Sequence, residues 1–310
     1  MTRVAAFDCG TNSLRLLVAD VEDGRKQDVH REMRVVRLGQ GVDRTGELAP
    51  EALERVRAAL ADYAVTCREL GVQASRFVAT SATRDARNRD AFVGLVQEAV
   101  GVLPEVVDGD TEAALSLLGA TRDLDPADGP YLVMDIGGGS TEFVVGGAGG
   151  VLGALSVDVG CVRLTERHLH DDPPTAAQVA AARADVEQAL VRVREVVPVG
   201  QARTAVGLAG SVTTVAALAL GLEAYDPARI HLSRLSADQV RQVCDALLAL
   251  PQVQRAALPV MHPGRVDVIG AGALVLRTAV DGLGLDEVLV SEADILDGIA
   301  WSVADGAGAT

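Results

Sequence analysis

The sequence predicts an α/β protein built from two related halves. Its 310 residues exceed the usual size of a single domain, and predicted strands alternate with predicted helices along most of the chain. One design occurs twice: an apolar strand ends at an aspartate and turns through glycine into a hydroxyl-rich loop, over Val4–Ser13 and over Tyr131–Glu142. A second β-rich segment follows each copy, at 14–19 and at 143–145. We therefore expect duplicated halves that close on one cleft.

The first half continues with a strand and then with alternating helices and strands. Apolar residues recur at helical spacing over 50–70, which predicts a long helix there. We also expect a third strand near 29–38, a strand at 76–79, and helices over about 85–100 and 110–120. The polar segment 122–130 is typical of a linker, so the first domain is predicted to span 1–122 and the second 123–310.

The second half repeats the alternation of strands and helices. Strands are predicted to end at Asp135 and to cover 141–145, 152–159, 204–208 and 287–290. Helices are predicted over about 162–170, 175–197, 237–250, 265–283 and 293–304, with a further helix after the loop 209–214. In such a fold, ligands bind at the carboxyl ends of the strands.

Charge and cysteine content exclude several classes of protein. The chain has 28 basic and 43 acidic residues, a net charge of −15, so no basic field is available for nucleic acid or for an anionic membrane. Lys26 is the sole lysine, which leaves nearly all positive charge on arginine, the residue that grips phosphate with two hydrogen bonds; codon bias is the alternative reason for this composition. The four cysteines are scattered without a C-x-x-C spacing, which favours thiols in a reducing compartment over a zinc site. Without a leader or a membrane-length apolar run, we expect a soluble cytoplasmic protein.

The common nucleotide-binding loops are absent, whereas acids and hydrogen-bond donors recur where predicted strands end. No P-loop is possible around Lys26, and Glu142 stands where G-x-G-x-x-G needs its third glycine. Hydrolysis of a phosphoanhydride needs a cation, donors that orient the phosphates, and a carboxylate that places water. The sequence offers all three classes, in Asp8, Glu112, Asp135 and Glu142 with Asn12, Ser13, Arg15, Arg84, Ser140, Thr141, Ser211 and Thr213.

Each of these residues also has a purely structural interpretation. Asp8 and Asp135 could cap turns, Glu112 could favour a helix N-terminus through the helix dipole, and Arg84 could lie on the surface. Their joint occurrence at the ends of separate strands favours a site.

Six segments of the chain, in order, closely resemble the exopolyphosphatase/guanosine pentaphosphate phosphohydrolase (Ppx/GppA) family. They lie at 8–16, 79–88, 135–142, 160–166, 210–214 and 290–298, and include Asp8-Cys9-Gly10-Thr11-Asn12-Ser13 and Asp135-Ile136-Gly137-Gly138-Gly139-Ser140. The resemblance implies the actin/Hsp70/sugar-kinase type of fold, with two ribonuclease-H-like domains, a catalytic cleft between them, and a last helix, about 293–305, that returns to the first domain.

The same resemblance implies Mg²⁺-dependent release of terminal phosphate from inorganic polyphosphate, with Mn²⁺ as an alternative metal. Glu112 matches the proposed water-activating glutamate and Glu142 a second essential acid, and Asp8 and Asp135 are the expected metal-side carboxylates. The expected phosphate-binding residues are Asn12, Ser13, Arg15, Arg84, Gly137, Gly138, Gly139, Ser140, Thr141, Gly210 and Ser211.

Two departures from the family's pattern bear on the substrate and on the catalytic acid. The chain ends at Thr310, as in the short two-domain subgroup, so we expect short polyphosphates to be preferred. Where the family often has adjacent acids, Asp110 and Glu112 flank Thr111, and Glu112 fits the register better. Guanosine pentaphosphate hydrolysis, a low-turnover sensor of polyphosphate or of the stringent-response alarmones, and a kinase of the same fold remain alternatives, and a homodimer is expected.

Overall fold

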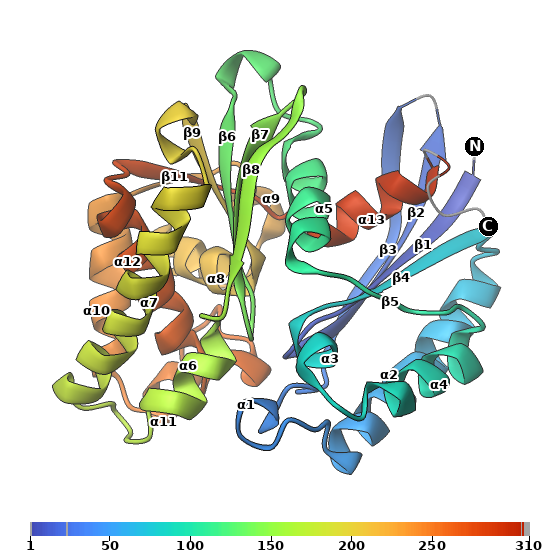
Figure 1. Cartoon of the computed structure of the whole chain (residues 1–310), viewed down its shortest axis with the longest axis horizontal. Coiled ribbons are helices and arrows are strands. Elements are labelled where there is room, and N and C mark those ends of the chain that lie inside the picture. Colours follow the sequence, from blue (N-terminus) through green and yellow to red (C-terminus); the bar gives the residue numbers. More distant parts are fainter. Residues whose placement is uncertain (1, 23, 305, 307–310) are drawn as a thin grey trace. The chain divides into compact units, whose positions relative to one another are not determined.

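The computed structural model describes residues 2–22, 24–304 and 306, and it divides into two compact units. Unit 1 comprises Met1–Gly119 together with Ile295–Thr310, and unit 2 comprises Ala120–Asp294 (Figure 1). Each unit contains one β-sheet and its own hydrophobic core.

The sheet of unit 1 has the strand order β3-β2-β1-β4-β5. The first three strands form an antiparallel meander, and β4 and β5 add in parallel beside β1. The strands are β1 (Thr2–Cys9), β2 (Ser13–Glu22), β3 (Arg25–Val35), β4 (Ala74–Ala79) and β5 (Glu105–Val106). Because β1 and β4 are parallel, the segments that follow Asp8 and Ala79 emerge at the same edge of the sheet.

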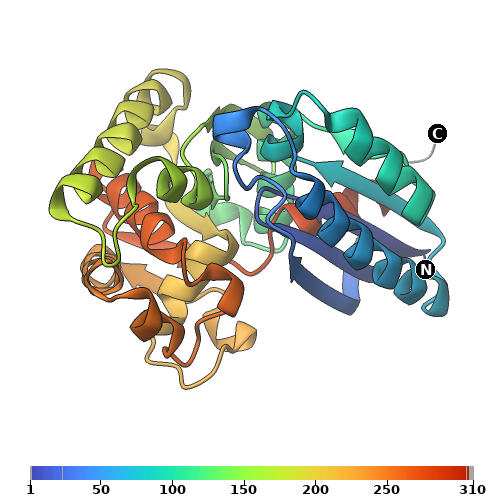
Figure 2. The ribbon, with the colours of Figure 1, turned by 90° about the horizontal axis from the view of Figure 1, so that it is seen from below.

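Helices cover both faces of this sheet. One face packs on α2 (Pro50–Glu69) and α4 (Arg89–Val100), which lie side by side and bury Val56, Leu60 and Phe92 (Figure 2). The other face packs on α13 (Ile295–Ala304) and on α5 (Gly109–Thr121), through Leu115, Ile299 and Trp301. The short helices α1 (Val42–Thr45) and α3 (Ser81–Asp85) complete the unit.

The sheet of unit 2 repeats the topology of unit 1. Its order is β10-β11-β9-β6-β7-β8, in which β8, β7 and β6 form the antiparallel meander and β9 and β11 add in parallel. The strands are β6 (Tyr131–Ile136), β7 (Thr141–Gly147), β8 (Gly150–Val157), β9 (Thr204–Leu208), β10 (Arg234–Ser236) and β11 (Glu287–Val290). The predicted α/β class with two ribonuclease-H-like halves is therefore confirmed.

The helices of unit 2 surround α12 (Ile269–Leu283), which is buried along most of its length. The others are α6 (Cys161–His168), α7 (Ala176–Val196), α8 (Ala209–Ala219), α9 (Pro227–Ile230), α10 (Ala237–Ala249) and α11 (Gln252–Ala256), with 3₁₀ turns at Pro126–Asp128, Val199–Gln201 and Pro263–Arg265. Capping boxes begin α7 at Thr175 and α10 at Ser236, which explains why both starts were predicted closely.

Several predicted boundaries were wrong. The third strand covers Arg25–Val35 instead of 29–38, because its alternation consists of charged side chains such as Arg31, which gave no apolar signal. The helix predicted from 85 begins at Arg89, since the extended backbone of Ala86 separates it from α3. The helix predicted from 265 begins at Ile269, after a 3₁₀ turn. The last helix begins at Ile295, and residue 305 lies outside the described residues.

Three of the four cysteines are buried, and none of the four forms a disulfide. The four thiols are free, and burial raises the pKa of Cys161 and of Cys244 to about 11, which makes both poor nucleophiles. Among the described residues, we find no helix with the length and apolarity needed to cross a lipid bilayer.

Candidate active site

The two copies of the strand–aspartate–glycine design fold into the same turn. In unit 1, the amide of Gly10 donates to the carbonyl of Ser13 at 3.0 Å, and in unit 2 the amide of Gly137 donates to the carbonyl of Ser140 at 3.0 Å. The aspartate that precedes each turn is buried, with Asp8 4% and Asp135 7% exposed. A buried carboxylate destabilises the fold unless it is paired with a cation or hydrogen-bonded, so each of these aspartates is expected to have a polar partner.

Asp8 is paired with Arg15 across β1 and β2. The two residues are directly opposite in the antiparallel register, and Arg15 approaches Asp8 Oδ2 through Nε at 2.8 Å and through Nη2 at 2.6 Å. The predicted metal-side carboxylate and a predicted phosphate-binding arginine are thus brought together, with part of the arginine fork engaged on the carboxylate.

The loop that carries Asn12 and Ser13 is held from two sides. The carbonyl of Asn12 accepts hydrogen bonds from the amides of Val36 and Arg37, at 3.0 and 2.9 Å, and the hydroxyls of Thr11 and Ser81 lie 2.8 Å apart. Arg37 has a φ of 49°, a left-handed conformation that is uncommon outside glycine. Non-glycine residues in this conformation cluster at functional sites.

Arg84 and Glu112 form a polar pair next to this loop. Arg84 Nη1 donates to the carbonyl of Val107 at 3.0 Å and to Glu112 Oε2 at 3.2 Å. Glu112 is only 7% exposed, whereas Asp110, the other acid of the motif, is exposed. The geometry therefore supports Glu112 as the acid of the site.

Sequence reasoning missed Asp108, which caps the helix that carries Glu112. Its carboxylate accepts from the amide of Thr111 at 2.9 Å, and this backbone hydrogen bond holds the pKa of Asp108 below its ordinary value. Aspartate just before the first turn of a predicted helix was the available signal.

In unit 2, the glycine loop presents its carbonyls to α6. The carbonyl of Gly137 accepts from the amide of Cys161, that of Gly138 from the amides of Val162 and Arg163, and that of Gly139 from Arg163 Nε. Because the N–H and C=O of a trans peptide point in opposite directions, the amides of residues 138–140 face away from α6. Three successive amides on one side of a loop are the arrangement found in anion-binding nests.

The close approach of α6 to this loop depends on Gly160. A Cβ at that position would lie 2.4 Å from the carbonyl oxygen of Gly138. Arg163 and Gly160 therefore support the loop, although only the loop itself was predicted as part of the site.

Asp135 and Glu142 are opposed across β6 and β7, in the register position that Asp8 and Arg15 occupy in unit 1. Both are buried, and Ser156 Oγ lies 2.6 Å from Glu142 Oε1 and donates to it. Side chains directly opposite on antiparallel strands share one face.

Two neighbouring carboxylates suit Mg²⁺, which takes one or two of them and completes its shell with water and substrate phosphates. No cluster of three or more His, Cys, Asp or Glu side chains able to hold a metal occurs in the described part of the chain. Asp135 and Glu142 offer the one or two carboxylates that a magnesium site completed by water and phosphate would use.

Two further predicted site residues of unit 2, Thr141 and Ser211, are buried and contact neighbouring parts of the fold. The buried Thr141 donates its hydroxyl to the carbonyl of Val159. Ser211, 6% exposed, packs so closely on α12 that a Cβ at Gly272 would lie 2.1 Å from its Oγ.

Arg265 lies over the first turn of α8, a placement that the sequence did not signal. Arg265 Nη1 donates to the carbonyl of Gly210 at 3.3 Å, and a Cβ at Gly210 would meet the guanidinium at 2.1 Å. Ala209, which opens α8, has a φ of 66°. The missing side chain of Gly210 and the left-handed conformation of Ala209 thus leave room for the Arg265 guanidinium beside this loop.

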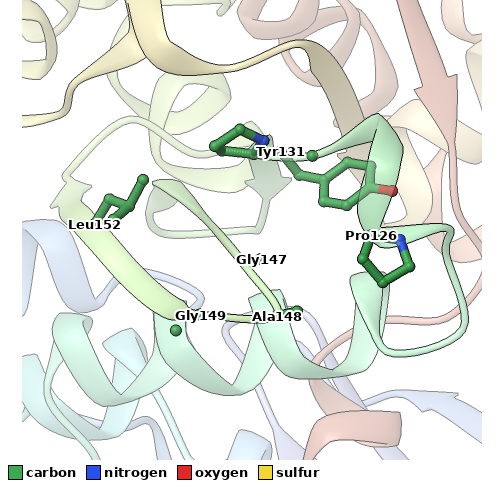
Figure 3. Close-up of a pocket in the computed structure, with 9 residues that line it drawn as sticks. Pro126, Tyr131, Gly147, Ala148, Gly149 and Leu152 are labelled. Atoms are coloured by element: carbon green, nitrogen blue, oxygen red, sulfur yellow. The ribbon is translucent and has the colours of Figure 1, made fainter.

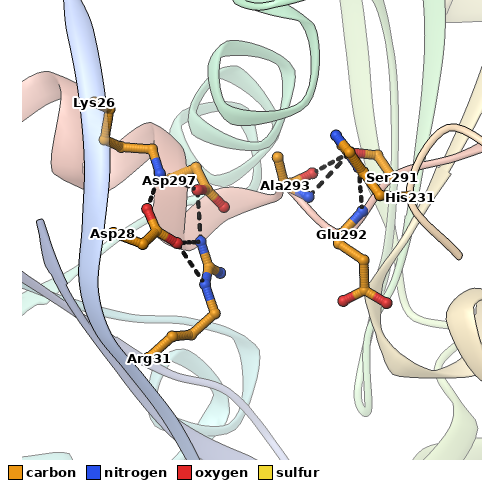
Figure 4. A network of polar contacts seen from close by, with 8 residues as sticks. All are labelled: Lys26, Asp28, Arg31, His231, Ser291, Glu292, Ala293 and Asp297. Atoms are coloured by element: carbon orange, nitrogen blue, oxygen red, sulfur yellow. Dashed lines mark hydrogen bonds and ion pairs between the residues drawn. The ribbon is translucent and has the colours of Figure 1, made fainter. Parts of the chain in front are cut away.

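A second polar cluster of unit 2 surrounds Glu292. Tyr225 Oη lies 2.7 Å from Thr213 Oγ1 and 2.6 Å from Glu292 Oε1, and burial together with the Glu292 charge raises the pKa of Tyr225. The backbone amide of Glu292 donates to His231 Nδ1 at 3.1 Å (Figure 4). This cluster connects Thr213, one of the sequence-identified donors, to the segment that follows β11.

The cavity shown in Figure 3 contains none of the predicted site residues. It has a volume of about 270 Å³ and lies at the β7–β8 turn, between Tyr131 and Leu152, with glycines and prolines as most of its other lining residues. Its lining has no charged side chain.

The comparisons with known proteins cover nearly the whole chain. The model of the Ppx/GppA phosphatase family matches residues 17–305. Exopolyphosphatase 2 of Mycobacterium tuberculosis is 51% identical over 317 residues, which cover 98% of this chain and 99% of the relative.

Two solved structures have the same fold over their full length. A crystal structure described as an exopolyphosphatase-like protein superimposes with a TM-score of 0.95 at 42% identity, and covers 99% of this chain and 100% of that one. The Aquifex aeolicus member of the Ppx/GppA family superimposes with a TM-score of 0.83 at 31% identity, and covers 100% and 99% of the two chains. With its duplicated sheets and its paired acid and glycine turns, this chain belongs to the Ppx/GppA phosphatase family.

Proposed function

We propose that this chain is an exopolyphosphatase that releases terminal orthophosphate from inorganic polyphosphate by metal-assisted attack of water. Family membership and 51% identity to an exopolyphosphatase over 98% of the chain support the reaction class. The observation that carries the proposal is the pair formed by the buried Glu112 and the half-buried Arg84, 3.2 Å apart at the edge of the unit 1 sheet.

This pair combines the two properties that hydrolysis requires. Glu112 provides a carboxylate that can orient a water molecule or accept its proton, which contributes roughly 10²- to 10⁴-fold in rate. Arg84 pairs with that carboxylate and adds positive charge where the transferred phosphoryl group carries negative charge.

The chain's other polar groups would bind the phosphates. The amides of residues 138–140 would form an anion nest, and Asn12 and Ser13 lie on the matching turn of unit 1. Asp8 and Asp135 are the proposed metal-side carboxylates, with Glu142 as a second essential acid opposite Asp135. Mg²⁺, or Mn²⁺ in its place, would neutralise the non-bridging phosphate oxygens when bound.

Further parts of the proposal concern the substrate and the setting. We propose a preference for short polyphosphates, a homodimer, and a cytoplasmic location, for which the four free thiols are the supporting observation. Guanosine pentaphosphate is the alternative substrate, and a low-turnover sensor of polyphosphate or guanosine tetraphosphate is the alternative role.

One assay separates these functions. Phosphate release by the purified chain with Mg²⁺ is measured in parallel on short polyphosphate, long polyphosphate, guanosine pentaphosphate and ATP. Faster release from short polyphosphate supports the proposal, and faster release from pentaphosphate assigns alarmone hydrolysis instead. Binding of these ligands by folded protein without phosphate release would overturn the enzyme and favour the sensor.

A further inference from the structure

The last helix, α13, is fastened to the sheet of unit 1 at two points. Near its start, the buried carboxylate of Asp297 accepts from Arg31 Nη2 at 2.6 Å and lies 3.0 Å from Lys26 Nζ, both on β3 (Figure 4). Near its end, Ser302 Oγ lies 2.7 Å from Nη1 of Arg76 on β4 and accepts from it. Because charged hydrogen bonds hold both ends, α13 forms a rigid surface on this face of the sheet.

Helix α5 contacts this surface backbone to backbone at Gly298. A Cβ on Gly298 would lie 2.0 Å from the carbonyl oxygen of Leu115, 2.8 Å from its carbonyl carbon and 3.2 Å from the amide nitrogen of Gly119. No flexible side chain is available to yield, so any larger residue must push α5 away from α13.

Glu112 lies one helical turn before this contact. Residues three apart share a helix face, so Glu112 and Leu115 move together when α5 moves. Arg84, the partner of Glu112, belongs to α3 and is held separately by the carbonyl of Val107. A displacement of α5 therefore changes the position of Glu112 relative to Arg84.

We propose that Gly298 is a positioning residue, and that the surface formed by α13 sets the location of the Glu112 carboxylate. This inference rests on the proposed function, in which Glu112 acts on the attacking water. Ordinary contact begins at about 3.4 Å, so an added methyl group requires a shift of more than about 1 Å at Leu115. Misplacement of a reacting group by about 1 Å costs on the order of 10²-fold in rate.

The test is the Gly298→Ala variant of the full chain, assayed for phosphate release from polyphosphate. We expect kcat to fall on the order of 10²-fold while KM changes less than about threefold, because the proposed phosphate-binding loops are untouched. Gly94→Ala is the matched control, since Gly94 lies in a helix of the same unit with open space around its Cα, and its kinetics should equal those of the wild type.

A double variant distinguishes positioning from general damage. Adding Gly298→Ala to Glu112→Gln should lower kcat by less than about twofold, because the effect passes through a carboxylate that is already lost. A full further loss in that background, or an unchanged kcat in the single variant, would overturn the inference.

A second variant keeps the inference testable if Gly298→Ala does not fold. Asp297→Asn loosens the fastening of α13, and we expect kcat to fall several-fold with KM preserved; an unchanged kcat in folded protein would overturn the inference. Failure of the proposed function is recognised separately, by a wild-type chain that releases no phosphate or by a Glu112→Gln variant of full activity.

Discussion

Gly160→Ala tests whether the glycine loop of unit 2 binds the phosphates of the substrate. The φ of Gly160 is −134° and its ψ is 165°, an extended conformation that alanine adopts without strain. The added methyl group would lie 2.4 Å from the oxygen and 2.5 Å from the carbon of the Gly138 carbonyl, and 2.7 Å from the carbonyl carbon of Gly139. The three atoms nearest to the added methyl group all belong to the backbone of the loop.

The expected magnitude follows from this overlap. The methyl group needs about 1 Å of extra space, and overpacking of this kind costs about 1–3 kcal/mol. Replacing glycine restricts the unfolded chain and returns only about 0.4–1 kcal/mol. The free energy of unfolding should thus fall by at most about 2.6 kcal/mol. The displaced amides of residues 138–140 should also raise the KM for polyphosphate by roughly 10- to 100-fold, equivalent to one lost charge-assisted hydrogen bond.

Two measurements check these values. Steady-state phosphate release over a range of polyphosphate concentrations gives KM and kcat, and urea unfolding followed by circular dichroism gives the stability. Gly200→Ala is the control, because a Cβ added there would meet nothing within 4 Å beyond its chain neighbours, and Gly200 belongs to the same unit. A Gly160→Ala variant with the KM of the wild type would refute the assignment of this loop to phosphate binding.

The remaining predictions concern the acid, the arginine, the metal and pH. Glu112→Gln should lower kcat by roughly 10²- to 10⁴-fold with polyphosphate binding intact, while Asp110→Asn stays near wild type; equal activity of the two variants in phosphate-release assays would remove Glu112 from the mechanism. Arg84→Ala should raise KM by roughly 10- to 100-fold, and an unaltered KM would make it a structural residue. EDTA should abolish phosphate release and Mg²⁺ restore it, and full activity in EDTA would exclude the proposed cofactor. Burial acts to raise the pKa of Asp185, but the hydrogen bonds and charges of His168 and Arg167 together outweigh burial and hold that pKa below its ordinary value of 3.8. Stability from this pair is therefore present above about pH 3.8 and lost as pH falls through the lower, folded-state pKa. In urea unfolding, the difference between the wild type and Asp185→Asn should shrink as the pH falls through that pKa, and a difference independent of pH over this acid range would contradict the pairing.

The spacing of apolar and polar residues predicted most of the helices and strands, because this spacing reflects interactions between residues that are close in the sequence. The strands that end at Asp8 and Asp135 are apolar and finish at glycine turns, so their position was clear from the sequence. The strand β3 and the short strand β10 (Arg234–Ser236) were misplaced or missed, since their side chains are charged or few. Such strands are stabilised by pairing with a neighbour, which a local pattern does not encode.

The features of the candidate site also separate into those that the sequence predicted and those that only the structure shows. The turns at Gly10 and Gly137, the acids at the strand ends and the motif around Glu112 could be read directly. The pairing of Arg84 with Glu112 and the support of the Gly138 carbonyl by α6 could not, because each joins segments that meet only when the sheet forms.

By itself, the sequence determined that two strand–aspartate–glycine turns exist and that the fold is a duplicated α/β one, because glycine and apolar periodicity act over a few residues. Tertiary structure alone decided which groups meet. Arg31 reaches Asp297 across 266 positions, Arg265 covers Gly210, and Gly298 meets the backbone of Leu115. These contacts depend on the packing of helices onto sheets, where close fit at the level of single atoms sets distances that residue types alone leave open.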